Sequence, residues 1–226
     1  MTIHYHGTPI TPREQLWLMA GKSFCVSYAD PRDAEVCLRI GQSVMWDNGA
    51  FSLYTQGKAV DWAGFYDWLE PRLGHPHWAV IPDVIDGDVE QNVALVKQWP
   101  FRKELGAPVW HLSEPIEVLL DYAEKFGRVC FGSSGAFWQV GSEAWCRRTD
   151  LAFNELSRLG GFPWIHMLRG MAVAGKRWPF ASVDSVNVAR NHKRQKTCPE
   201  AMARTIDAVQ CPVKWQVQSE QMEMIA

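Results

Sequence analysis

The sequence contains no window that approaches about 18 consecutive apolar residues, the length at which a stretch is taken for a membrane-spanning helix. The segment that begins Met-Thr-Ile-His-Tyr-His lacks the basic region and apolar run of a secretory signal. The six cysteines form no Cys-x-x-Cys pair and no closely spaced set, which excludes the disulfide framework of a small secreted domain. These absences predict a cytoplasmic protein with reduced thiols and no membrane segment.

Neither sign of charge dominates the chain. Its 23 Lys and Arg residues nearly balance 25 Asp and Glu residues, for a net charge of −2. This balance excludes a strongly basic nucleic-acid-binding protein of the histone type but leaves a local basic face possible. One run of cations, Arg190 to Lys196, is either a solvated loop or a contact for phosphates.

The chain also lacks internal repeats, low-complexity tracts and a clear linker. With 226 residues, 47% of them hydrophobic, it can bury one sizeable core. We therefore expect a single domain over residues 1–226.

What the chain does contain is a set of short apolar segments that end in polar or acidic residues. Four of them cover residues 44–51, 79–83, 129–135 and 181–185. Continuous apolar runs are typical of parallel strands that are buried on both faces. In α/β barrels the catalytic groups lie where such strands end. The carboxylates at three of these ends, Asp47, Asp83 and Asp184, are therefore predicted to meet at one barrel mouth.

The apolar segments alternate with helical patterns. The predicted strands are 23–29, 43–47, 77–83, 109–112, 128–132, 163–168, 181–184 and 213–217. The predicted helices include 61–69, 88–98, 115–126 and 142–159. Eight strands separated by helices favour an α/β fold, a compact (β/α)8 barrel of the TIM type.

The order of the strand ends carries a family resemblance. The run Asp47-Asn48-Gly49-Ala50-Phe51-Ser52 resembles the Asp-Ser-Gly-Gly/Ala-Phe-x motif of the tRNA-guanine transglycosylase (queuine tRNA-ribosyltransferase) superfamily. Further resemblances follow in the family's order, to its base-binding aspartate, its glycine-rich strand end, its His/Tyr-Leu-x-Gly-Val/Met strand and its nucleophile strand: Asp83, Phe131 to Gly135, His166 to Met171, and Ser182 to Ser185. The similarity spans roughly residues 43–190.

The chain departs from the family's tRNA enzymes in two respects. It lacks their Cys-x-Cys-x-x-Cys zinc segment, and no appended RNA-binding domain is visible in this shorter sequence. It is more similar to the reduced phage-type members, some of which install 7-deazaguanine bases in DNA. The resemblance therefore implies exchange of a guanine in DNA or tRNA for a free deazapurine base, without cofactor or metal, in the cytoplasm of a bacterium or a phage-infected host. DNA, tRNA and a small nucleoside remain open as substrates.

The resemblance also implies roles for individual residues. Asp184 corresponds to the nucleophile that attacks C1′ of the sugar, and such a step suits a carboxylate because the reaction passes through an oxocarbenium-like state. Asp47 is the candidate for moving the proton of the departing and arriving base. Asp83 would accept hydrogen bonds from N1–H and the exocyclic amine of a base that has left its stack. The other predicted substrate contacts are His111, Gly132, Ser133, Ser134, Phe51, His166 and Arg190.

Each of these residues also has a structural interpretation. Asp47 before Asn-Gly can cap a turn, and Asp83 can cap a helix or belong to a solvated acidic loop. His192, Cys198 and Cys211 could supply zinc ligands, although their spacing matches no common motif. Aromatic stacking on a base could come from tryptophans near strand ends, namely Trp46, Trp110 and Trp138.

Two other functions remain open for the whole chain. One is a nucleic-acid or nucleotide binding barrel without turnover, and the other is a hydrolase of N-glycosidic bonds that uses water as the acceptor. The presence of both Asp47 and Asp184 favours an enzyme over a binding protein.

Overall fold

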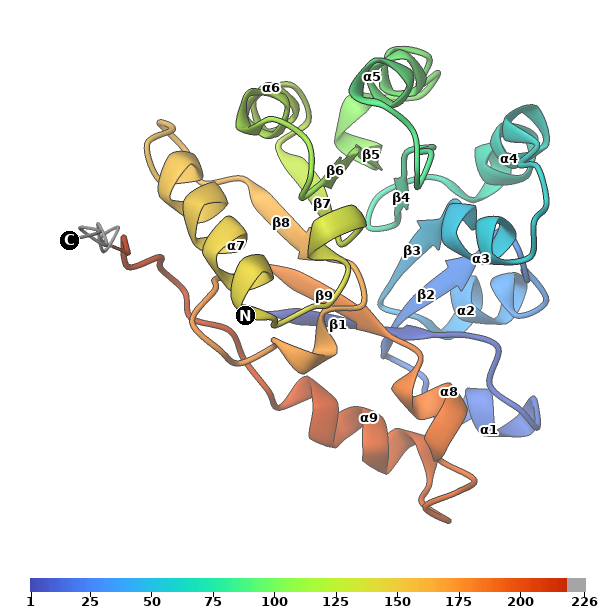
Figure 1. Ribbon diagram of the computed structural model, residues 1–226. Helices are drawn as coiled ribbons and strands as arrows, with labels where there is room; N and C mark the ends of the chain where they lie inside the picture. Colours follow the sequence, from blue (N-terminus) through green and yellow to red (C-terminus); the bar gives the residue numbers. More distant parts are fainter. Residues whose placement is uncertain (219–226) are drawn as a thin grey trace.

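A computed structural model describes residues 1–218, and these form an α/β barrel with helices around a central parallel sheet (Figure 1). The strand order is β5-β4-β3-β2-β1-β9-β8-β7-β6, and every pairing is parallel. The strands are β1 (Ile3–Gly7), β2 (Ser23–Ser27), β3 (Ser43–Asp47), β4 (Trp78–Val80), β5 (Gly106–Ala107), β6 (Val109–His111), β7 (Arg128–Gly132), β8 (Trp164–Met167) and β9 (Ser182–Ser185). The α-helices are α1 (Glu14–Trp17), α2 (Ala34–Ile40), α3 (Ala50–Thr55), α4 (Trp62–Leu69), α5 (Val89–Lys97), α6 (Ile116–Phe126), α7 (Glu143–Leu156), α8 (Asn187–Asn191) and α9 (Pro199–Asp207). The predicted (β/α)8 barrel is confirmed.

The two ends of the sheet meet at Pro108. This residue separates β5 from β6, which follow each other directly in the chain, and proline has no N–H to donate to a ladder. The segment still pairs on both sides, because the N–H of Ile81 donates to the carbonyl of Ala107 at 2.9 Å and the N–H of Cys130 donates to that of Pro108 at 2.9 Å. Residues 106–111 therefore act as one barrel strand, which pairs with β4 through β5 and with β7 through β6.

Side chains along each strand alternate between the barrel interior and the helical layer. In β3, Val44 and Trp46 belong to the large apolar cluster that includes helix residues such as Phe65. Met45 belongs instead to a smaller cluster formed by residues from several strands, which fills the interior. Asp47 shares the inward face of Met45, two residues further on, and so points into the mouth of the barrel.

The amino-terminal end of the barrel interior is filled by aromatic rings around a cation. The guanidinium of Arg128 lies 4.8 Å from the ring centre of Trp78 and 5.3 Å from that of Trp164. The indole N–H of Trp78 donates to the hydroxyl of Tyr5 at 2.8 Å. These side chains fill the barrel interior beneath the polar groups at the carboxyl ends of the strands.

The predicted helices are confirmed, with small differences at their ends. Asp61 caps α4 by accepting from the N–H of Gly64 at 2.9 Å. Asp88 forms a capping box with Gln91 at the start of α5. Ser142 caps α7 by accepting from the N–H of Trp145 at 3.3 Å. No helix within residues 1–218 is long and apolar enough to cross a membrane.

The prediction is wrong about two strands: it includes a last strand at 213–217 that the structure lacks, and it omits β1. The segment 213–217 is not a strand, because Val213 is 87% exposed and Val217 is 67% exposed, and the alternating pattern there has no sheet to pair with. Its place in the barrel is taken by β1. The apolar pattern of β1 is interrupted by His4 and His6, which are buried against the region of α9: His6 pairs with Asp207 at 2.9 Å.

Candidate active site

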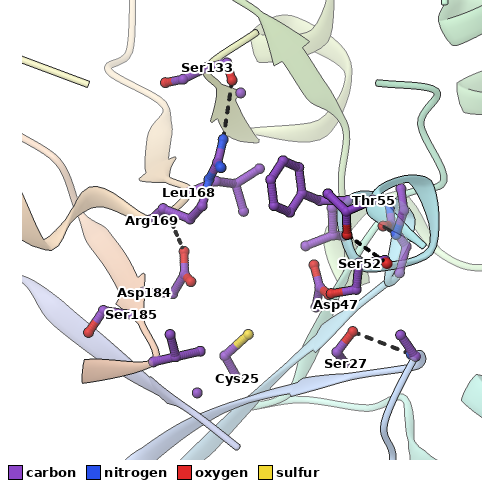
Figure 2. A pocket seen from close by; sticks show the side chains of 18 of the residues that line it. Cys25, Ser27, Asp47, Ser52, Thr55, Ser133, Leu168, Arg169, Asp184 and Ser185 are labelled. Carbon is purple, nitrogen blue, oxygen red and sulfur yellow. Dashed lines mark hydrogen bonds between the residues drawn. The ribbon is translucent and has the colours of Figure 1, made fainter. Parts of the chain in front are cut away.

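The carboxyl ends of the strands surround a cavity of about 1170 Å³. Figure 2 shows Asp47 and Asp184 pointing into this space from facing sides. Of the residues predicted to form the site, all but His166 line the cavity: Asp47, Phe51, Asp83, His111, Gly132, Ser133, Ser134, Asp184 and Arg190. Side chains more than 130 positions apart in the sequence thus meet because parallel strands end at one edge.

Asp47 is the carboxylate with the most strongly altered acidity in the cavity. Burial raises its pKa to about 6, and the negative charges of Asp184 and Asp83 add to this effect. A hydrogen bond from the hydroxyl of Ser27 and one from the N–H of Gly49 oppose it without cancelling it. A carboxyl group with this pKa can both release and take up a proton near neutral pH.

The turn interpretation of Asp47 is also correct. Its Oδ2 accepts from the N–H of Gly49 at 3.1 Å, and Gly49 has a φ of 78°, which glycine adopts without strain. A Cβ at Gly49 would also lie 2.9 Å from the backbone nitrogen of Ala29. The turn therefore orients Asp47 toward the cavity, and the structural and chemical roles of this residue coexist.

Asp184 is held by one of its two oxygens. Its Oδ1 accepts from the backbone N–H of Arg169 at 2.7 Å and from Nε2 of His166 at 3.3 Å. Both of these bonds go to Oδ1, and no other partner of the carboxylate occurs within residues 1–218. Oδ2 therefore has no hydrogen-bond partner within the described residues, and the carboxylate as a whole is only 12% exposed.

His166 supports Asp184 rather than contacting the cavity. Its side chain has no exposed surface and does not line the cavity, so the structure gives no support to the predicted contact with a substrate. Its Nδ1 lies 2.8 Å from the hydroxyl of Ser182, which accepts from the indole N–H of Trp164 at 2.8 Å. Because the carboxylate of Asp184 can only accept, Nε2 must carry the ring proton, and Ser182 can donate to Nδ1. This series of hydrogen bonds fixes the orientation of the imidazole ring of His166.

Arg169 spans the mouth of the cavity and was not predicted from the sequence. Its backbone has a φ of 55°, in the left-handed region that non-glycine residues rarely adopt. Its guanidinium lies 4.3 Å from the ring centre of Phe51 and donates to the carbonyl of Ser133 at 3.2 Å. Figure 2 shows the side chain running from Asp184 to Ser133. The Leu-Arg-Gly sequence after β8 was the only signal that could have drawn attention to it.

Asp83 is buried in a polar network at the opposite side of the mouth. Its Oδ1 accepts from Nδ2 of Asn48 at 2.7 Å, and its Oδ2 pairs with Nε2 of His111 at 3.0 Å. The Nδ1 atom of His111 lies 3.2 Å from the hydroxyl of Ser134. Each carboxylate oxygen keeps one lone pair for a ligand. Asp83 caps no helix, since Asp88 has that role for α5.

Gly132 and Ser133 shape the wall beside His111. A Cβ at Gly132 would lie 3.1 Å from Nδ1 of His111 and 2.9 Å from a methyl group of Val109, so a larger residue would displace the imidazole. The hydroxyl of Ser133 accepts from the indole N–H of Trp145 at 3.0 Å. This bond ties the strand end to α7, and the backbone carbonyl of Ser133 is the group that meets Arg169.

No protein-family model, curated protein or solved structure matches the chain. The resemblance to the transglycosylase superfamily therefore stays a prediction, carried by the motifs and their arrangement.

Two sequence hypotheses have no support in the site. Trp46 and Trp110 are fully buried under the helical layer and cannot stack on a base, whereas Trp138 is 68% exposed and lies outside the cavity lining. Within residues 1–218 no group of three or more His, Cys, Asp and Glu residues is placed to hold a metal ion. Nε2 of His192 instead lies 3.1 Å from the carbonyl of Thr11.

Proposed function

We propose that the protein is a base-exchanging glycosyltransferase that replaces a guanine in a polynucleotide with a 7-deazaguanine derivative. The observation that carries this proposal is the pair of carboxyl groups, Asp47 and Asp184, which face one cavity in different environments. Burial gives Asp47 a pKa of about 6, whereas Asp184 is held through Oδ1 by two donors. Two carboxyl groups in unlike surroundings are suited to two different roles.

In the first half of the reaction, Oδ2 of Asp184 attacks C1′ of the sugar and the bond from C1′ to N9 of guanine breaks. The proton of Asp47 passes to the departing base, which leaves as neutral guanine. The transition state resembles an oxocarbenium ion, and the nearby carboxylate charge stabilises it. The product of this half is a glycosyl ester on Asp184.

In the second half, the deazapurine takes the place of guanine. Asp47, now a carboxylate, accepts the proton from the pyrrole nitrogen of the incoming base. That nitrogen attacks C1′ and releases Asp184, so that each carboxyl group returns to its starting state. Attack by water in place of the base would hydrolyse the glycosyl ester and leave an abasic site in the polynucleotide, a product that analysis distinguishes from exchange.

The surroundings of the cavity suit a guanine-like base on a phosphate backbone. The free lone pairs of Asp83 can accept from N1–H and the exocyclic amine, a donor pair that adenine does not present. Arg190 lines the cavity from α8, and the cations at Lys193, Arg194 and Lys196 are exposed just beyond it. Such cations can contact the phosphates that flank a flipped nucleotide.

The proposal is tested with labelled 7-deazaguanine and guanine-containing DNA and tRNA oligonucleotides. We expect the label to enter one of these polymers and a covalent adduct to survive on a denaturing gel. Asp184→Asn should abolish both signals without changing the unfolding midpoint, because the amide oxygen can still accept from Arg169 and His166. Asp67→Asn, at an exposed position of α4, is the matched control and should retain exchange. Wild-type exchange rates in Asp184→Asn would overturn the assignment.

A further inference from the structure

The three side chains Asp83, His111 and Ser134 form a continuous hydrogen-bonded chain that ends at the cavity. Nε2 of His111 lies 3.0 Å from Asp83, and Nδ1 lies 3.2 Å from the hydroxyl of Ser134. All three residues are less than 10% exposed, yet all three line the cavity. Ser134 precedes the short 3-10 helix Gly135–Phe137 without capping it, so its hydroxyl is not engaged by the backbone there.

The proton on His111 decides which way the hydroxyl of Ser134 points. The carboxylate of Asp83 can only accept, so Nε2 of His111 donates to it. In the neutral ring Nδ1 is then an acceptor, and the hydroxyl proton of Ser134 is used in the bond to His111. In the charged ring Nδ1 donates to the oxygen of Ser134, and the hydroxyl proton is free to be donated into the cavity.

The groups that face His111 favour the charged ring. Burial lowers the pKa of His111, but the hydrogen bond and charge of Asp83, together with the charges of Glu114 and Asp86, outweigh burial and raise it. The carboxylate of Glu114 accepts a hydrogen bond from the backbone N–H of His111 at 3.2 Å. Burial raises the pKa of Glu114 itself, so its charge contributes most above the acidic range.

We propose that Ser134 is a specificity-determining residue that donates its hydroxyl proton to the 6-oxo group of the base, and that His111 is the positioning residue that frees this proton. The inference rests on the proposed function and adds one contact that recognises the base in the same pocket. Ser134 and Asp83 would then recognise adjacent atoms of the base, the acceptor at position 6 and the donors at N1 and the 2-amino group.

The same three types of side chain occur in acyl-transfer triads, where the histidine takes the proton of a serine nucleophile. A charged imidazole has no lone pair for that step. The geometry and the surrounding carboxylates therefore favour Ser134 as a donor to a ligand over Ser134 as a nucleophile.

The test compares binding of 7-deazaguanine and 6-thio-7-deazaguanine by calorimetry at several pH values. The two bases share N1–H and the 2-amino group and differ only in the acceptor at position 6, where sulfur is weak. We expect wild-type protein to prefer the oxo base by about three- to tenfold, the equivalent of one hydrogen bond. Ser134→Ala should remove this preference, and Ser113→Ala, an exposed serine outside the cavity, should keep it.

The pH profile isolates the role of His111. The preference should be full below the ordinary imidazole pKa of about 6.5 and should shrink only at higher pH, where the ring loses its proton, because its surroundings raise the pKa of His111. Titration of Asp47 affects both bases alike and cancels in the ratio. In His111→Gln, where no charged ring can form, the ratio should not change with pH.

Three outcomes would overturn the inference. An unchanged oxo preference in Ser134→Ala would show that this hydroxyl does not contact position 6. A wild-type preference that is constant with pH would remove His111 from the account, and covalent labelling of Ser134 by a fluorophosphonate would make it a nucleophile. If wild-type protein binds neither base, the proposed function itself fails, a result that differs from all three.

Discussion

The backbone N–H of Arg169 donates a 2.7 Å hydrogen bond to Oδ1 of Asp184. The bond lies in a turn in which Arg169 has a left-handed backbone conformation, with a φ of 55°. A residue that disfavours the left-handed region would force this turn to rearrange, and with it the peptide group that carries the N–H. The backbone of one residue thus positions the carboxylate that we propose as the nucleophile, while its side chain reaches across to Ser133.

This relationship predicts a difference between two substitutions that both remove the guanidinium. Asparagine tolerates the left-handed region, whereas a β-branched residue is strongly disfavoured there, by about 1–2 kcal/mol. The turnover number of Arg169→Val should therefore be about tenfold lower than that of Arg169→Asn. The measurement is the rate of base exchange at saturating substrate. Equal rates for Asn and Val would show that the backbone of residue 169 does not control Asp184.

The raised pKa of Asp47 predicts the pH dependence of the first chemical step. In the proposed reaction, protonated Asp47 is required to release guanine, and its pKa is about 6. The single-turnover rate of guanine release should consequently be constant below about pH 6 and fall about tenfold for each pH unit above it. In Asp47→Asn the rate should be low and this decline should be absent. A decline that persists in the variant would assign the titration to another group.

The same pKa has a consequence for stability. The pKa of the Asp47 carboxyl group is raised from its ordinary value of 3.8 to about 6 in the folded protein, so the folded state binds the proton more tightly. The resulting stability is present below pH 3.8 and is lost as the pH rises through 6. At neutral pH the loss amounts to as much as about 3 kcal/mol.

Asp47→Asn should therefore increase the free energy of unfolding at pH 8 while it slows exchange. The amide oxygen can still accept from the N–H of Gly49, so the turn is preserved. The gain should be smaller at pH 5 than at pH 8, and urea titrations at the two pH values measure it. A variant that is less stable than wild type at pH 8 would mean that the carboxylate makes favourable contacts that outweigh its burial.

Removal of the Asp83 carboxylate should destabilise the protein, in contrast to removal of the Asp47 charge. It is 6% exposed and accepts from Asn48 and His111, so Asp83→Ala leaves two buried donors without partners. Breaking such a pair costs about 3–5 kcal/mol. The control is Asp86→Ala, an exposed position in the same loop, which should change stability by less than about 1 kcal/mol. Similar small effects for both variants in urea titrations would contradict the buried network.

Part of this site could be predicted from the sequence because acids at the ends of apolar strands are conspicuous. Asp47, Asp83 and Asp184 each follow such a run, and the parallel sheet brings them together. The sequence does not show how far below the cavity a given residue of a strand lies. His166 lies two residues before Leu168, where this strand end begins to line the cavity, and this difference separates a residue that supports Asp184 from one that lines the cavity.

The contribution of Arg169 could not be predicted for a different reason. Its role depends on a backbone conformation and an N–H group, which every non-proline residue possesses. The first strand was missed because two histidines interrupt its apolar pattern, and the partners that make their burial tolerable come from the other end of the chain. Hydrogen bonds between residues about 200 positions apart leave no pattern in the local sequence.

The final prediction concerns the cations that follow β9. Arg190, Lys193, Arg194 and Lys196 are all exposed, and Arg190 lines the cavity itself. If these side chains contact phosphates beside a flipped nucleotide, each neutralised phosphate adds roughly 0.7–0.9 to the slope of log affinity against log salt concentration. Replacing all four by Ala should flatten the slope by about two to four units, without changing the affinity for a free base.

The matched control removes four cations from the outer helices and loops, at Lys97, Arg102, Lys125 and Arg147, all of which are exposed. It changes the net charge by the same amount, so a general electrostatic effect would flatten both slopes equally. Fluorescence anisotropy of a labelled oligonucleotide over a range of salt concentrations measures the two slopes. A wild-type slope in the first variant would show that the segment after α8 is a solvated loop, and would favour a small nucleoside over a polynucleotide as the substrate, because such a ligand carries no flanking phosphates for these cations to neutralise.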